Sequence, residues 1–298
     1  KYIKVINTFH RLCEKSKFEL IILPTIERVE LFSRTVGNFS DIVTKQMYNF
    51  VDKKGRELVL RPEGTAGVMR HYLDKNYNDE KMYFYSSQMF RYERPQKGRY
   101  REFHQVGAET IGSSNRNIES ISNIVLLGMS FMADVFNNEI EVTLKVNSIG
   151  TNDDRQKYSM KLTEYFESHK NSLSVESQNR LKSNPLRILD SIDRNDVEIT
   201  KQAPKFADFR SDDSNSDYES FKENISKIPF EEDNNLVRGL DYYNGITFEY
   251  IPEGETGSQA TLGGGGQYDS LSTLIDNKQV NGVGFAFGVD RIIDLIKD

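Results

Sequence analysis

Apolar positions along the chain follow two spacings, and together they predict a fold that mixes helices with strands. Apolar residues near a 3.6-residue period predict helices around residues 3–13, 27–36, 65–71, 117–136 and 153–168. The first of these rests on Ile3, Ile6, Phe9, Leu12 and Cys13. Strict alternation or short apolar runs predict strands over residues 19–23, 81–91, 102–111, 141–147 and 282–287. The expected fold class is therefore α+β.

Turn residues add two hairpins to this pattern. Strands 47–51 and 57–60 would join through Lys53, Lys54 and Gly55. Strands 235–243 and 246–251 would join through Asn244 and Gly245, a strong two-residue turn signal. By contrast, SDDSNSD at residues 211–217 has no apolar residue to pack, so a mobile or disordered loop is expected there.

Composition fits an ordinary soluble protein and excludes several classes. In 298 residues, no apolar run approaches the roughly 20 needed to span a bilayer, so no membrane partner is expected. Cys13 is the only cysteine and the four histidines are scattered, which leaves no internal disulfide and no zinc-ligand spacing. A reducing cytoplasm is the simplest compartment. The net charge of −6 argues against broad nonspecific binding to nucleic acid.

One stretch, residues 90–109, reverses the sign of the local charge. It reads FRYERPQKGRYREFHQVGAE and carries Arg91, Arg94, Lys97, Arg99 and Arg101. Such a basic loop in an acidic chain indicates a polyanionic ligand, and arginine suits phosphate because its planar fork makes two hydrogen bonds. The alternative is an exposed basic hairpin, which is what charge runs usually are.

The arm after this loop offers complementary chemistry. In a strand over 102–111, Phe103, Gln105 and Glu109 share one face, with Gly107 between them. A glycine there lets a ligand approach the backbone. His104, Val106 and Ala108 would point to the core. An aromatic plate, an amide and a carboxylate beside cations suit a ligand with a flat ring, a phosphate chain and a positive group.

Three stretches together resemble the histidyl-tRNA synthetases, which are class II aminoacyl-tRNA synthetases. Residues 90–109 resemble motif 2, LVRGLDYYNG at 236–245 resembles the histidine-specific signature, and GVGFAFGVDRI at 282–292 resembles motif 3. LPTIERVELFSRTVG at 23–37 resembles motif 1, which in the family forms the dimer interface. The resemblance covers almost the whole chain.

The resemblance implies ATP-dependent activation of L-histidine and transfer to tRNA(His) in the cytoplasm, by a homodimer. It places the histidine amino group on Glu63, Thr65 and Gln105, and the ring on Glu109 and Tyr243, with Tyr242 as the adjacent candidate. Gly64 and Arg238 would complete the histidine-binding set. ATP would contact Arg91, Glu93, Arg99, Phe103 and Arg291. Arg91 and Arg238 would be catalytic at the α-phosphate, where many class II enzymes place a metal. No protein metal site is expected; Mg²⁺ would bridge the outer phosphates of ATP.

The same resemblance implies an antiparallel sheet flanked by helices, with a helical insertion, and it divides the chain. Residues 1–147 and 232–298 would form the catalytic core, and 148–231 an inserted domain that in the family touches the tRNA acceptor arm. The family's short N-terminal segment and its C-terminal anticodon-binding domain are expected to be absent from this chain. TLGGGGQYDS at 261–270 departs from the family, with Gln267 where arginine is usual and Ser270 where glycine is common.

Other functions remain open. One is a non-catalytic, synthetase-like regulatory subunit of ATP phosphoribosyltransferase; another is a histidine- or tRNA-sensing dimerisation domain. Six residues that such a regulator would lose favour the enzyme, and Gln267 counts against it; the six are Arg91, Arg238, Glu63, Gln105, Glu109 and Arg291. The chain lacks GxxxxGK[ST], and GVGFAFG lacks the βαβ context of a dinucleotide fingerprint.

Overall fold

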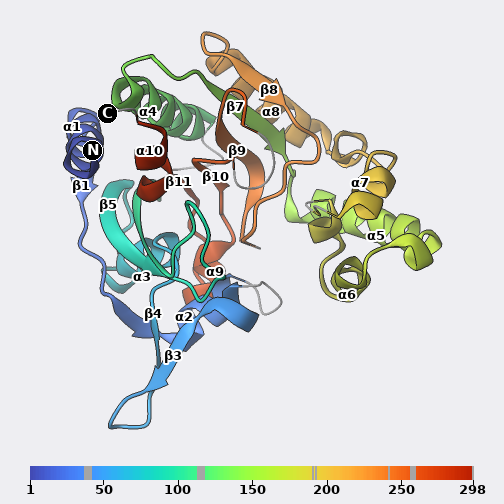
Figure 1. Cartoon of the computed structure of the whole chain (residues 1–298), viewed down its shortest axis with the longest axis horizontal. Helices are drawn as coiled ribbons and strands as arrows, with labels where there is room; N and C mark the ends of the chain where they lie inside the picture. Colours follow the sequence, from blue (N-terminus) through green and yellow to red (C-terminus); the bar gives the residue numbers. More distant parts are fainter. Residues whose placement is uncertain are drawn as a thin grey trace.

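An eight-stranded, mostly antiparallel sheet forms the centre of the computed structural model, which describes residues 1–36, 42–112, 118–189, 191, 193–240, 242–255 and 260–296 (Figure 1). The strand order is β1-β5-β6-β11-β10-β9-β7-β8. The bounds are β1 Glu19–Leu20, β5 Lys81–Phe90, β6 Glu102–Ile111, β7 Val142–Ser148, β8 Phe230–Glu232, β9 Asn244–Pro252, β10 Gly263–Gln267 and β11 Gly282–Gly288. Only the two edge pairings, β1 with β5 and β7 with β8, are parallel. The α+β fold class predicted from the sequence is confirmed.

Helices cover one face of this sheet because their apolar stripes pack on its alternating apolar residues. They are α1 (Tyr2–Lys15), α4 (Ile118–Phe136), α8 (Asp212–Asn224) and α10 (Val289–Leu295). Val5 and Phe9 of α1 pack in the same core as Phe131 of α4 and Phe285 of β11. Among the described helices, only α4 is long and apolar enough to cross a membrane, and more than half of it is buried in this core.

The other face of the sheet carries α3 (Thr65–Asp74) and α9 (Leu271–Asp276), which leave room for a cavity between them and the strands. Below them lies a three-stranded sheet, ordered β2-β4-β3, with α2 (Val29–Thr35) packed against it (Figure 1). Its strands are β2 Ile26–Arg28, β3 Tyr48–Val51 and β4 Glu57–Leu60. A π-helical turn, Ile42–Gln46, precedes β3.

A helical subdomain projects from one side of the sheet (Figure 1). It comprises α5 (Asn152–Ser168), α6 (Val175–Ser183), α7 (Arg194–Thr200) and short 3-10 turns at Lys170–Ser172, Pro185–Ile188 and Phe206–Phe209. Its apolar residues, such as Tyr158 and Leu162, are continuous with a core that also includes Tyr242 and Tyr243. The boundaries 148 and 231 remain predictions.

Two expectations about local structure were wrong. Residues 212–217 begin helix α8: Ser211 caps the helix, accepting from the backbone N–H of Ser214 at 3.4 Å. Tyr218 and Phe221, just beyond the polar run, pack in the core and anchor the helix. The prediction was wrong because it considered the polar residues without the apolar residues of the next turn. Residues 235–243 form no strand: β9 pairs with β7 and β10 and has no free edge for them.

Smaller differences lie near the N-terminus. Strand β1 has two residues, and 26–28 form a strand, so α2 begins at Val29. In α1 the buried stripe is Val5, Phe9 and Cys13, while Ile3 is 72% exposed. The remaining predicted helices and strands are found within a few residues of their expected bounds. Gly37 and Asn117, expected at helix ends, lie outside the described residues.

Candidate active site

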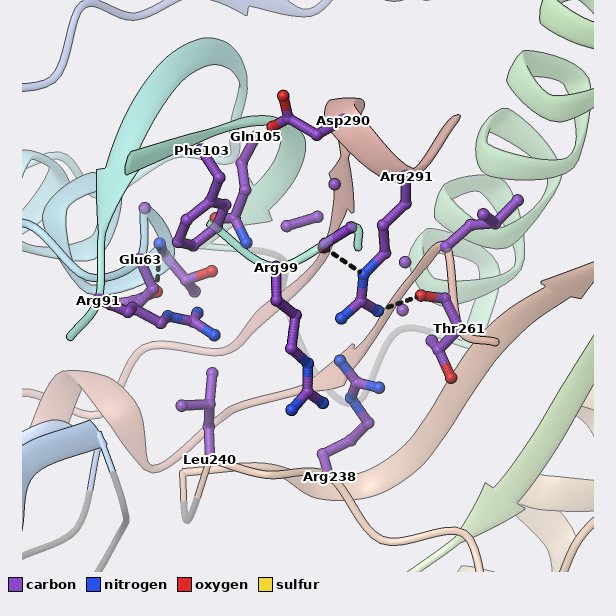
Figure 2. A pocket seen from close by; sticks show the side chains of 18 of the residues that line it. Glu63, Arg91, Arg99, Phe103, Gln105, Arg238, Leu240, Thr261, Asp290 and Arg291 are labelled. Atoms are coloured by element: carbon purple, nitrogen blue, oxygen red, sulfur yellow. Dashed lines mark hydrogen bonds between the residues drawn. The ribbon is translucent and has the colours of Figure 1, made fainter. Parts of the chain in front are cut away.

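One cavity of about 180 Å³ opens on the sheet face that carries α3, and its wall collects most of the candidate residues (Figure 2). Of the residues expected to bind histidine or ATP, only Glu109 does not line it; the others do: Glu63, Gly64, Thr65, Arg91, Glu93, Arg99, Phe103, Gln105, Arg238, Tyr242, Tyr243 and Arg291. They come from the α3 N-terminus, β5–β6, the 233–243 loop and α10. Four segments far apart in sequence therefore converge here.

Four guanidinium groups dominate the electrostatics of the cavity, those of Arg91, Arg99, Arg238 and Arg291 (Figure 2). Arg91 Nε donates to the carbonyl of Pro62 at 2.9 Å, and its guanidinium lies 5.2 Å from the ring centre of Phe103. Burial lowers the pKa of Arg91, and burial together with the charge of Arg99 lowers that of Arg291. Cations held this close together, partly out of water, form a strong anion-binding site.

The basic loop splits between two roles. Arg91 and Arg99 face the cavity, whereas Arg94, Lys97 and Arg101 do not line it. Arg101 instead lies 4.4 Å over the ring of Tyr92. Arg99 Nη1 lies 3.8 Å from Glu93 Oε2, so Glu93 orients a cation as well as lining the wall. Of the basic residues in this stretch, only Arg91 and Arg99 are therefore placed where a ligand in the cavity could meet them.

Glu63 sits between Pro62 and Gly64, at the corner where strand β4 gives way to helix α3. Its carboxylate accepts from the backbone N–H groups of Thr65 at 2.7 Å and Ala66 at 3.0 Å, and so caps α3. Tyr242 donates to it at 3.4 Å. Burial raises the pKa of Glu63. The carboxylate thus both caps the helix and faces the cavity, where a cationic amino group would neutralise its charge.

Glu109 lies behind the cavity wall. It is fully buried and accepts hydrogen bonds from the hydroxyls of Thr65 at 2.7 Å and Tyr268 at 2.6 Å. Burial raises its pKa to about 8. The strand alternation correctly put Phe103 and Gln105 on the cavity face and Val106 and Ala108 in the core, but His104 is half-buried against Tyr2.

Tyr85 also lines the cavity, although no role was predicted for it. Its ring occupies the space over Gly64 and Gly107, where an added Cβ would lie 2.4 Å and 2.3 Å from ring carbons. Its buried hydroxyl has no hydrogen-bond partner, and the same is true of Gln105 Oε1 and Arg238 Nε. Buried polar atoms are almost always paired, so three unpaired ones around one cavity indicate a polar ligand.

Other lining residues were also missed: Gly98, Tyr100, Leu240, Thr261, Leu262, Gly263, Gly264, Ala286, Gly288 and Asp290. Spacing along the chain could have identified two of the missed residues. Tyr85 shares the strand face of Arg91, and Leu240 follows Arg238 by two positions. The glycine run 263–266 proves to be a central strand, with Gly263 and Gly264 at the cavity. Gln267 does not line it; its Oε1 accepts from the N–H of Ile246 at 2.8 Å.

An antiparallel sheet that presents an arginine-lined cavity between a β-hairpin and a helix N-terminus defines the catalytic core of a class II aminoacyl-tRNA synthetase. The family model for histidyl-tRNA synthetase matches residues 1–292. The chain belongs to the histidyl-tRNA synthetase family.

Individual relatives agree with this assignment. The chain is 38% identical over 300 residues to a histidine--tRNA ligase of Campylobacter hominis, covering 99% of this chain and 72% of that protein. It is 41% identical over 288 residues to that of Pediococcus pentosaceus, covering 94% and 67%. The solved apo histidyl-tRNA synthetase of S. aureus matches with a TM-score of 0.75 and 31% identity, over 99% of this chain and 70% of that one.

The fold alone does not separate enzyme from regulator. A Bacillus halodurans structure described as an ATP phosphoribosyltransferase regulatory subunit/histidyl-tRNA synthetase matches with a TM-score of 0.69 at 21% identity, covering 100% of this chain and 79% of that one. The assignment as a histidine--tRNA ligase therefore rests on the curated relatives, which match nearly the whole chain.

Proposed function

We propose that this chain activates L-histidine with ATP and transfers it to tRNA(His), as a histidine--tRNA ligase. The observation that carries this proposal is the cavity itself. Four arginines line it, and three buried polar atoms of its wall have no hydrogen-bond partner: Tyr85 Oη, Gln105 Oε1 and Arg238 Nε. In the first step the histidine carboxylate attacks the α-phosphate and pyrophosphate leaves. In the second, a ribose hydroxyl of the tRNA attacks the acyl carbon of histidyl-adenylate, forming the ester and releasing AMP.

The arginines would lower the barrier that arises from repulsion between the carboxylate of histidine and the phosphates of ATP. Arg91 and Arg238 would stabilise negative charge at the α-phosphate, and Arg99 and Arg291 would hold the β and γ end. Phe103 would stack on adenine. Because these cations are fixed before the substrate arrives, little reorganisation is needed in the transition state.

Histidine would be recognised at both ends. Glu63, Thr65 and Gln105 would hold the α-amino group, beside Gly64, which leaves space for the ring of Tyr85. Tyr243, with Tyr242 beside it at 4.8 Å between ring centres, would meet one ring nitrogen. Glu109 lies behind the wall and would act on the other nitrogen through Thr65, which lines the cavity and whose hydroxyl donates to the Glu109 carboxylate. Amino acids that leave these groups unpaired would be rejected.

Mg²⁺ would enter with ATP. Within the described part of the chain, no group of three or more His, Cys, Asp or Glu side chains could hold a metal ion. Mg²⁺ needs no such cage, because it commonly binds through one or two carboxylates and the substrate phosphates. Glu93 and Asp290 line the cavity and would hold it, and it would neutralise charge on the outer phosphates.

Two partners follow from surfaces rather than from the cavity. The β2–β4–β3 sheet and α9 expose apolar residues, namely Ile26, Phe50, Val51 and Leu274, near the motif 1 segment. We propose that this face forms a homodimer; sedimentation that gives a monomer at micromolar concentration would exclude it. Residues 148–231 would act as the inserted domain that meets the tRNA, and the protein would work in the cytoplasm.

The substitution at Gln267 does not weaken the enzymatic reading. Its side chain supports the start of β9 from outside the cavity, so the pocket loses no arginine. The regulatory alternative would instead predict a cavity that binds histidine without chemistry.

ATP–pyrophosphate exchange tests the proposal. Exchange should require histidine among a panel of amino acids, and Arg238→Ala should lower its rate by roughly two to four orders of magnitude. Arg11→Ala, which breaks an exposed ion pair with Asp134, is the matched control and should leave the rate unchanged. No exchange in the unmodified protein, or full exchange in Arg238→Ala, would refute the proposal.

A further inference from the structure

A short hydrogen-bonded path joins two of the cavity arginines. Arg238 Nη1 is paired with Glu249 Oε1. The hydroxyl of Thr261 donates to Glu249 Oε2 at 2.8 Å. The carbonyl of Thr261 accepts from Arg291 Nη1 at 2.5 Å (Figure 2). Glu249 and Thr261 thereby connect a cation on a loop to a cation on α10.

The two ends of this path differ in how firmly the backbone holds them. Glu249 lies inside β9, opposite Gly264 of β10 and Lys145 of β7, so ladders on both sides fix its position. Arg238 lies in the 233–243 loop, outside every described strand. Its guanidinium is therefore placed by side-chain contacts, chiefly that with Glu249.

The charges around Arg238 also indicate that Glu249 holds its guanidinium in place. Arg238 is buried in a cavity it shares with three other arginines, which repel it. Burial works to lower the pKa of Arg238, but the charge of Glu249 more than offsets this and raises it. The carboxylate of Glu249, which the sheet fixes in place, thus stabilises the charged guanidinium of Arg238 in the protein without bound phosphate.

We propose that Glu249 and Thr261 are positioning residues that set the separation of Arg238 and Arg291, so that both guanidinium groups engage one triphosphate chain. This rests on the proposed function. The opposite role is also chemically conceivable, with the carboxylate competing with phosphate for Arg238. The two roles predict opposite signs for the effect on ATP affinity.

Three variants test the proposal: Glu249→Gln, Thr261→Val and Thr261→Ser. Calorimetric titration with ATP measures positioning without any chemistry. We expect Glu249→Gln to weaken ATP binding about tenfold and to lower kcat for exchange about a hundredfold, with the histidine KM changed less than twofold. Thr261→Val should show a smaller loss of the same kind, and Thr261→Ser, which keeps the hydroxyl, should restore most of it. Asp134→Asn, which breaks a distant surface pair, is the control.

Tighter or unchanged ATP binding in Glu249→Gln would overturn the proposal, and tighter binding would identify the carboxylate as a competitor. Equal losses in Thr261→Ser and Thr261→Val would remove Thr261 from the path. Failure of the unmodified protein to exchange with histidine would instead refute the proposed function, while the titration with ATP would still decide the inference.

Discussion

The buried carboxyl of Glu109 links one residue to the pH dependence of the whole fold. Burial raises its pKa to about 8, above its ordinary value of 4.5, so the folded state binds a proton that the unfolded state releases. Its contribution to stability is complete below pH 4.5 and is lost as pH rises towards 8. We expect Glu109→Gln to remove this loss, which has a slope of at most about 1.4 kcal/mol per pH unit.

Chemical denaturation of both proteins between pH 5 and 8 measures this. The free energy of unfolding should fall more steeply with pH in the unmodified protein than in Glu109→Gln. Parallel slopes would mean that Glu109 ionises in the folded state much as it does in the unfolded chain.

Tyr85 provides a second test at the scale of one residue. Its hydroxyl is buried at the cavity near Thr65 and Glu109 but makes no hydrogen bond of good geometry, so removing it costs the free protein little. We expect Tyr85→Phe to keep or slightly raise the melting temperature and to raise the histidine KM about tenfold, the value of one buried hydrogen bond. Steady-state exchange at varied histidine checks this, with Tyr92→Phe on the loop surface as control. An unchanged KM would show that the hydroxyl does not meet histidine.

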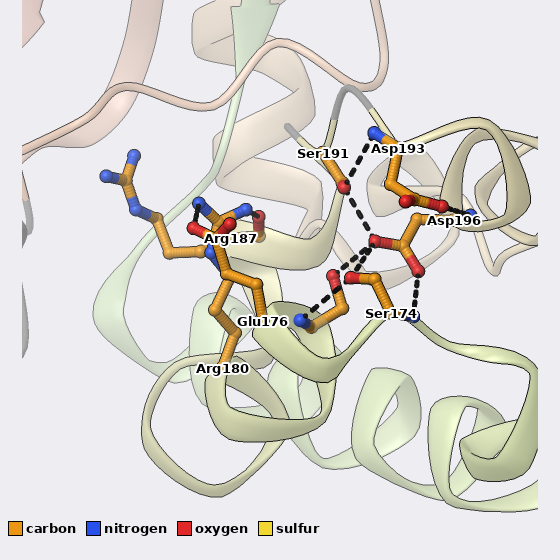
Figure 3. A network of polar contacts seen from close by, with 8 residues as sticks. Ser174, Glu176, Arg180, Arg187, Ser191, Asp193 and Asp196 are labelled. Atoms are coloured by element: carbon orange, nitrogen blue, oxygen red, sulfur yellow. Dashed lines mark hydrogen bonds and ion pairs between the residues drawn. The ribbon is translucent and has the colours of Figure 1, made fainter.

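Among whole elements, the carboxylate of Asp196 in α7 holds several segments of the helical subdomain together (Figure 3). It accepts from the N–H and hydroxyl of Ser174, at 2.8 and 2.7 Å, and from the hydroxyls of Ser177 and Ser191, at 2.6 and 2.7 Å. We expect Asp196→Ala to destabilise the subdomain by about 3 kcal/mol, because buried donors lose a charged acceptor.

Limited proteolysis between 150 and 210 measures that loss. The hydrogen bonds also lower the pKa of Asp196 despite its burial, so its contribution is present above pH 3.8 and lost as pH falls further. Asp193→Ala, which removes only the cap of α7, should cost about 1 kcal/mol. Equal cleavage rates for the two variants would contradict the central role of Asp196.

Elements with strong local periodicity could be predicted from the sequence, and those determined by distant partners could not. Strand 102–111 was placed correctly because its alternation is visible locally. The strand expected at 235–243 was wrong because β7 and β10, distant in sequence, occupy both edges of β9. Local motifs also predicted Arg91, Arg238 and Arg291 as site residues, because a motif can be recognised along the chain. The contact between Thr261 and Glu249 could not be predicted in this way, because the folded sheet brings the two residues together.

For the molecule as a whole, the helical subdomain holds part of the cavity wall. The 233–243 loop carries Arg238 and Tyr243 and gains no strand ladder. Arg155 of α5 donates to the carbonyl of Tyr243 at 3.2 Å, and the guanidinium of Arg187 lies against Gly239. Contacts made by the subdomain therefore reach the residues expected to bind the histidine ring.

This arrangement predicts that a change in the subdomain alters amino-acid recognition. Arg155→Met removes a charged donor worth about 1.5 kcal/mol or more, and should raise the histidine KM about tenfold while ATP affinity stays nearly constant. Arg155→Lys keeps a charged donor and should recover part of the loss. Arg210→Met is the matched control, because Arg210 also joins the subdomain to the sheet, donating to the carbonyl of Ser148 at 3.1 Å, but does not line the cavity. If both methionine variants changed the histidine KM equally, the effect would be one of general stability, and Arg155 would have no specific link to the site.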